Sequence, residues 1–211
     1  RQPLHTLDGG RVRGADGRQP HGQDSQRRER RTAVLPQPAA TEAYGWDILS
    51  RFYENMVKDG GNVYFLYDRY TRAPENAKLG PAAWGAAALI SAIDEGLAGI
   101  EDLDCRYRSL GFSPRWPVTP YKELRYFTGY EFTGDVVDVR YILTDAGMRY
   151  CIDSPAKDIQ AHILLPEGVS AAKVLLNGHE ISFTPSNVAG SHYIDFSARH
   201  LKGRTDIEIL F

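Results

Sequence analysis

The carboxylate side chains in and beside the predicted helical part carry the most informative chemistry. Asp68 and Glu75 lie in a polar loop, and Asp94 and Glu95 interrupt an apolar stretch. Glycosidic bond cleavage uses a carboxyl pair: one acid protonates the leaving oxygen, and a second carboxylate acts as base or nucleophile on the opposite face of the sugar. Spacing along the chain does not fix the distance between these groups. Solvated charges on a loop and a helix face are therefore the alternative interpretation.

Aromatic side chains are abundant around the same region and offer flat surfaces for a sugar ring. Besides Trp84 and Trp116, the series comprises Tyr107, Phe112, Tyr121, Tyr126, Phe127, Tyr130 and Phe132. Packing between domains is the alternative role, because aromatic residues dominate buried cores and interfaces.

Other familiar kinds of site are not indicated. The six histidines lack the spacing of metal ligands, and there is no nucleophile elbow, phosphate-binding loop or dinucleotide fingerprint, so we expect neither a metal nor a cofactor. Cys105 and Cys151 are too few for a disulfide framework and lack zinc spacing, which favours two unreactive thiols over a single bridge.

Composition indicates a globular chain with an ordinary core. Of 211 residues, 42% are hydrophobic and 11% aromatic, and the formal net charge of -2 gives no basic face for nucleic acid. No stretch reaches the roughly 18 apolar residues of a membrane helix, so we expect a soluble protein without a membrane partner. No signal peptide is recognisable at the start of the sequence, which leaves the compartment open, including a periplasmic or secreted parent protein.

The first 40 residues differ in composition from the rest and are predicted to be a disordered or non-native tail. All Trp, Tyr and Phe residues lie from Tyr44 onward, while the tail is rich in Arg and Gly. Such a segment buries too little apolar surface to offset its ordering entropy. A nucleic-acid-binding arm at 27–31 and a truncated or frame-shifted gene are the alternatives.

Residues 41–104 are predicted to form a helical hairpin. The first helix starts near Thr41 and ends at Gly60-Gly61, with one apolar face made of Trp46, Leu49, Phe52, Tyr53 and Met56. The second runs from Pro81 to Ile100 and is apolar almost all round in its first half. A helix of that kind needs neighbours on every side, and one other helix does not supply them. We therefore expect either a fragment of a larger protein or a homo-oligomer that buries this helix.

From residue 121 the hydrophobic period changes to two and predicts an antiparallel β-sandwich over 121–211, after a linker at 105–120. The runs 137–143 and 148–152 form one hairpin, and a second hairpin crosses Asn177-Gly178. Further strands are expected at 158–165, 188–196 and 206–211. Short strands with turn residues about every ten positions are typical of a sandwich, so the fold class is α+β.

The order of these elements resembles the end of bacterial six-hairpin glycoside hydrolases. The resemblance lies in Leu79–Ile90, Glu95–Ile100 and Leu110–Pro117, the last containing Ser-Pro-Arg-Trp-Pro, and in Ile163–Gly168 followed by Val174–Gly178. In that family an (α/α)6 barrel ends in a small-residue inner helix and is followed by a β-sandwich. The resemblance implies that this chain holds only two of the barrel helices and a C-terminal sandwich.

The resemblance also implies a function and a set of site residues. Loops that enter inner helices of such a barrel face the sugar cleft, which selects Asp68 and Glu75 as catalytic candidates. The same argument selects the substrate-binding candidates Tyr67, Arg72 and Trp84, and Trp116 is added to them as an aromatic platform for a sugar ring. We expect a fragment of a carbohydrate-active enzyme that binds an oligosaccharide or polysaccharide and is inactive alone. A carbohydrate-binding sandwich and a module that dimerises through 81–100 remain alternatives.

Overall fold

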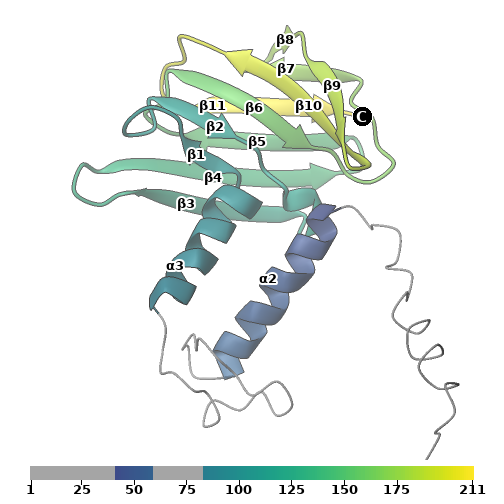
Figure 1. Ribbon diagram of the computed structural model, residues 1–211. Helices are drawn as coiled ribbons and strands as arrows, with labels where there is room; N and C mark the ends of the chain where they lie inside the picture. Colours follow the sequence, from purple (N-terminus) through teal and green to yellow (C-terminus); the bar gives the residue numbers. More distant parts are fainter. Residues whose placement is uncertain (1–40, 59–82) are drawn as a thin grey trace, which may run out of the picture. The chain divides into compact units, whose positions relative to one another are not determined.

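The computed structural model describes residues 41–58 and 83–211, and over those residues the fold is α+β, as predicted: two helices precede two β-sheets (Figure 1). Helix α2 spans Thr41–Lys58. Helix α3 spans Ala83–Ser91 and continues as a π-helical segment, η2, over Ala92–Leu97. No helix within the described residues is long and apolar enough to cross a membrane. The tail at 1–40 and the segment that joins the two helices lie outside the described residues.

The second helical segment ends at Leu97, before the predicted end at Ile100, because Gly99 turns the chain out of the helix. Gly99 has a φ of 64°, and a Cβ atom there would lie 2.0 Å from the carbonyl carbon of Ser113. The amide of Ser113 donates a 2.7 Å hydrogen bond to the carbonyl of Gly99. Only glycine combines a left-handed backbone with so close an approach. The chain therefore passes directly from η2 into the first strand.

The first sheet has five strands in the order β1-β2-β6-β10-β9. They span Ile100–Asp102 (β1), Ser109–Phe112 (β2), Asp158–Leu164 (β6), Thr184–Val188 (β9) and Ser191–Ala198 (β10). The pairing of β2 with β6 is parallel, so this sheet is mixed, whereas the sequence indicated antiparallel pairing throughout. Strand β2 also lies inside the stretch interpreted as a linker at 105–120.

The second sheet has six strands in the order β3-β4-β5-β11-β7-β8, all antiparallel. They span Glu123–Tyr130 (β3), Asp135–Thr144 (β4), Gly147–Asp153 (β5), Lys173–Leu176 (β7), His179–Ile181 (β8) and Thr205–Leu210 (β11). Short 3-10 helix η3, Trp116–Val118, connects the first two strands of the other sheet to this one.

Turn chemistry explains which hairpins the sequence predicts correctly. Asn177 and Gly178 have φ values of 51° and 80° and join β7 to β8, as expected for this dipeptide. The predicted hairpin between β4 and β5 is also confirmed. The single strand expected at 188–196 is instead two strands, because Ala189 and Gly190 adopt positive φ values of 51° and 91° and form a turn between β9 and β10.

The core lies between the two sheets, which form two layers in Figure 1. Side chains alternate along β4, where Val137, Val139 and Tyr141 are fully buried. Across the layers, the rings of Phe112 and Tyr150 meet edge to face with centroids 5.3 Å apart. The other fully buried large side chains come from both sheets: Leu110, Ile152, Ile159, Ile163, Ile194, Ile207 and Ile209.

Both cysteines are free thiols. Partial burial, with Asp206 nearby, raises the pKa of Cys151 above its usual range. A raised pKa lowers the thiolate fraction at neutral pH, so Cys151 is a poor nucleophile.

Candidate functional site

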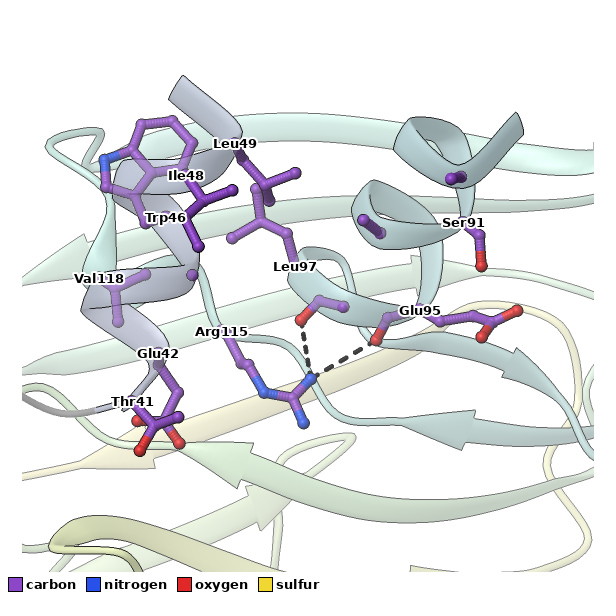
Figure 2. Close-up of a pocket in the computed structure, with 14 residues that line it drawn as sticks. Thr41, Glu42, Trp46, Ile48, Leu49, Ser91, Glu95, Leu97, Arg115 and Val118 are labelled. Atoms are coloured by element: carbon purple, nitrogen blue, oxygen red, sulfur yellow. Dashed lines mark hydrogen bonds between the residues drawn. The ribbon is translucent and has the colours of Figure 1, made fainter. Parts of the chain in front are cut away.

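An apolar cavity of about 820 Å³ lies between α2 and the helical segment α3–η2 (Figure 2). Helix α2 lines it with Trp46, Ile48 and Leu49, and the opposite side is formed by small residues of α3 and η2 and by Leu97. Figure 2 shows Arg115 at the end of this space where the helices meet the sheets. The two helices therefore do not fill the space between them.

The guanidinium of Arg115 binds η2 to the loop that follows β2. Its Nη1 donates to the carbonyl of Gly96 at 2.8 Å and to that of Ser113 at 3.1 Å, with a longer contact of 3.5 Å to the carbonyl of Glu95 (Figure 2). A cation at the end of a helical segment satisfies carbonyl groups that have no partner inside the helix. Arg115 thus acts here as a structural clamp.

Glu42 holds the start of α2 against the first sheet. Its two carboxylate oxygens accept hydrogen bonds from Ser191 Oγ and from the Tyr193 hydroxyl, both on β10. Partial burial would raise the pKa of Glu42, but the hydrogen bonds from Ser191 and Tyr193, together with the positive charge of Arg115, outweigh it and lower that pKa below 4.5. We call Glu42, Ser191 and Tyr193 the helix latch. The contact between α2 and β10 is strongest when Glu42 is ionised.

A second cavity, of about 660 Å³, lies beside α2 and is rich in aromatic side chains. Trp46 meets Tyr121 edge to face with centroids 6.3 Å apart, and Trp116 packs against Tyr126 at 6.0 Å. Tyr121 is half exposed, with 52% of its surface accessible. The remaining walls come from Tyr53, Leu89 and Ile93 of the helices and from Leu124 of β3.

Asp94 of η2 accepts a hydrogen bond from the hydroxyl of Tyr126 on β3. Burial, reinforced by this contact with the carboxylate, raises the pKa of Tyr126 far above its usual range. The tyrosine is therefore a permanent donor to Asp94. Among the sequence-selected carboxylates that the structure describes, Asp94 is thus engaged in joining a helix to a strand, while Glu95 is exposed at the rim of the first cavity.

The structure describes only part of the predicted site. Asp68, Glu75, Tyr67 and Arg72 lie outside the described residues. Trp84 lies on α3 with 62% of its surface exposed.

Trp116, the other proposed sugar platform, is 6% exposed and belongs to the core, which is the packing role weighed as the alternative for the aromatic series. Among the described residues, no three His, Cys, Asp or Glu side chains gather as metal ligands would.

Sequence reasoning missed the two charged groups that fix the helical part, Glu42 and Arg115. A Glu in the first turn of a helix is a recognisable signal, because a carboxylate there is favoured by the helix dipole. Its partners on β10 are far away in the chain, and nothing local indicates them. Because Glu42 and Arg115 bind groups of the same chain, the described part of the junction is mainly apolar, with Glu95 as an exposed carboxylate at the rim of the first cavity.

Comparison with known proteins gives partial similarity to solved structures. No protein-family model matches the chain, and no curated protein matches its sequence. Among solved structures, the α-L-rhamnosidase from Dictyoglumus thermophilum, a glycoside hydrolase, is similar to this chain with 13% sequence identity and a TM-score of 0.44. The alignment covers 74% of this chain and 17% of the rhamnosidase, so the chain spans a small part of that enzyme's length.

Proposed function

We propose that this chain is the sandwich end of a glycoside-hydrolase-like, carbohydrate-active protein, and that α2 and α3 dock against further helices of a barrel in that protein. The chain supplies structure and part of the sugar cleft, and it has no hydrolytic activity by itself. The observation that carries the proposal is the contrast between a sandwich with a buried core and a helix, α3, none of whose residues is buried.

The exposed apolar side chains lie along both helices. On α2, Tyr44 is 65% exposed and Tyr53 is 58% exposed; on α3, Trp84 is 62% and Ile90 is 58% exposed. No residue of α3 is buried. Full burial of one such side chain contributes about 1.5–3 kcal/mol, so covering several of them is a strong driving force for a partner surface.

The composition of α3 favours another helix as that partner. Ala86, Ala87 and Ala88 give it a surface of small side chains, which allows a neighbouring helix to approach closely. The sequence resemblance supports the same partner, because a small-residue helix, a Ser-Pro-Arg-Trp-Pro passage and a sandwich follow one another in the barrel enzymes. A second copy of this chain is the competing partner.

In the assembled protein, we assign Asp68 and Glu75 to the cleft as the candidate acid and base, with Tyr67, Arg72 and Trp84 as sugar contacts. The full chain incubated with a panel of glycans is expected to release no reducing sugar. Release that disappears in Glu75→Gln would contradict the proposed dependence on a larger barrel. An open reading frame encoding further helices directly upstream of Arg1 in the source DNA would support it.

The docking surface has its own test. We expect the full chain to bind the hydrophobic dye ANS or to self-associate at high concentration, and the double variant Trp84→Asp, Ile90→Asp to lose most of that signal. Phe132→Asp is the matched control, because Phe132 is fully exposed and lies on the turn between β3 and β4 rather than on a helix. A monomeric chain that binds no dye would contradict the docking surface.

A further inference from the structure

A polar groove of about 480 Å³ crosses the outer face of the first sheet, apart from the apolar cavities beside α2. Its polar side chains come from four strands and from the residue after β2: Glu101 on β1, Ser113 after β2, Gln160 and His162 on β6, Thr184 on β9, and Asp195 and Ser197 on β10. All are exposed or half-buried, so they are accessible from solvent.

Strand register brings these side chains together. His162 lies directly opposite Asp195 across β6 and β10, and Gln160 lies opposite Ser197. Thr184 lies opposite Asp195 on the other side of β10. Residues opposite one another in a sheet project from the same face, with Cβ atoms about 5 Å apart. The result is a continuous belt of hydrogen-bonding groups across the sheet.

Gly111 of β2 forms the hollow at one end of the belt. It lies opposite Gln160 on one side and Glu101 on the other. A Cβ atom at this position would lie 3.1 Å from the Cβ atom of Glu101 and 3.4 Å from Leu103 Cδ2. A larger side chain would therefore fill the groove and push on its wall.

His162 is held in a fixed orientation at the centre of the groove. Its Nδ1 lies 2.5 Å from Asp195 Oδ1, and its ring stacks on Tyr193 with centroids 4.0 Å apart and an interplanar angle of 11°. This arrangement occupies one ring nitrogen, and no described residue hydrogen-bonds to Nε2. A buttressed imidazole with one nitrogen available suits recognition of a ligand hydroxyl.

We propose that this groove binds a neutral carbohydrate. Amide, hydroxyl, imidazole and carboxylate groups together both donate and accept hydrogen bonds, as sugar hydroxyls require. Among the described residues that line the groove there is no Lys or Arg, which disfavours phosphates and other anions. Of the apolar residues in its lining, Ala161 and Phe196 are buried in the core and Leu103 is exposed, so the accessible apolar wall is small, which disfavours a hydrophobic ligand. The inference deepens the proposed function by giving the sandwich a sugar contact of its own.

The test is titration of the full chain with neutral sugars, L-rhamnose, D-glucose, D-galactose and D-xylose and their short oligomers, followed by amide NMR spectra. We expect at least one sugar to shift the amide signals of Gln160, His162 and Asp195. Gly111→Leu should abolish those shifts by filling the groove. Gln160→Ala should weaken binding by about tenfold, the loss expected for one hydrogen-bonded pair.

The control variant is Glu123→Ala, an exposed polar residue on β3 in the other sheet, which should leave the affinity unchanged. Gln160 is itself exposed, so its variant keeps the test valid even where Gly111→Leu disturbs folding. Shifts confined to the helical part, equal affinities in Gln160→Ala and the parent chain, or no response to any sugar would overturn the proposal. If the double variant Trp84→Asp, Ile90→Asp loses dye binding and still binds the sugar, the groove and the docking surface are independent sites.

Discussion

The helical junction and the outer face of the first sheet use their polar groups in opposite ways. At the junction, Glu42, Arg115 and Asp94 are each engaged by groups of the same chain, and the surface left over is apolar. On the sheet, the polar side chains face solvent around a hollow, and the apolar surface is limited. The first region therefore suits the proposed docking against protein, while the second suits the proposed binding of a hydroxyl-rich ligand.

The largest expected effect separates the two tryptophans that resemble sugar platforms in sequence. Trp116→Ala should lower the free energy of unfolding by about 3–5 kcal/mol, because a buried aromatic side chain is removed from the core. Trp84→Ala should change it by less than about 0.5 kcal/mol, because its side chain is largely exposed. Urea unfolding curves measure both. Similar losses in the two variants would show that α3 is packed as firmly as the sandwich.

Gly99, which joins the helical segment η2 to strand β1, should be the next most sensitive position. Gly99→Ala should cost about 3 kcal/mol or more, because the added Cβ collides with the Ser113 backbone and the backbone is left-handed. Gly134→Ala is the matched control: its φ of 69° is similar, but no atom lies within 4 Å of the added Cβ. That control should cost about 1–2 kcal/mol. Thermal unfolding measures the loss of stability in both variants. Equal losses would show that the left-handed backbone, and not the collision with Ser113, causes the effect at Gly99.

Breaking the helix latch should release α2 without unfolding the sandwich. Glu42→Gln should weaken the docking of α2 by about 1 kcal/mol, since the half-buried carboxylate loses two charge-assisted hydrogen bonds that solvent partly replaces. Amide hydrogen exchange should accelerate in α2 and stay slow in β4 and β5. Glu54→Gln, an exposed change on the same helix, is expected to leave exchange unaltered. Uniform acceleration through both regions would mean that they unfold together.

The smallest expected effect is a pH dependence confined to the latch. Because the pKa of Glu42 is lower in the docked state than its ordinary value of 4.5, docking favours the ionised form. Its contribution should be complete above pH 4.5 and disappear as the pH falls through the lower, docked pKa. NMR signals of α2 followed during acid titration measure this change. The same titration in Glu42→Gln should lack the transition, and its persistence there would assign it to another group.

Local signals in the sequence account for the parts of the fold that were predicted. Asn177-Gly178 specifies a hairpin by backbone preference alone, and the alternation from Val137 to Leu143 specifies which face of β4 is buried. The end of η2 at Leu97 was missed because its cause is the close approach of Gly99 to Ser113, which no local pattern encodes. The latch and the groove were missed for the same reason: each joins residues from strands or helices that are distant in sequence.

For the candidate site, the sequence indicates which residue types could bind or cleave a sugar, but not where those residues lie in space. Residue type alone marked aromatic and carboxylate side chains near the helices as candidates, but the roles of the two tryptophans depend on burial, which distinguishes Trp116 from Trp84. The sheet groove contains ordinary polar residues whose spacing along the chain carries no signal. Gly111 marks the hollow only once its neighbours across two strand pairs are known.

The parallel pairing of β2 with β6 has a consequence for the order in which the molecule assembles. The chain between these two strands contains β3, β4 and β5, which pair locally as successive hairpins of the other sheet. Closing a long loop is slower than forming a hairpin, so we expect β3–β5 to become protected first and the β2–β6 pair later. Pulse-labelled hydrogen exchange would reveal the sequence of events. The proposed sugar binding by the groove would then serve as a late marker of refolding, because Gly111 and Gln160 become neighbours only when that loop has closed.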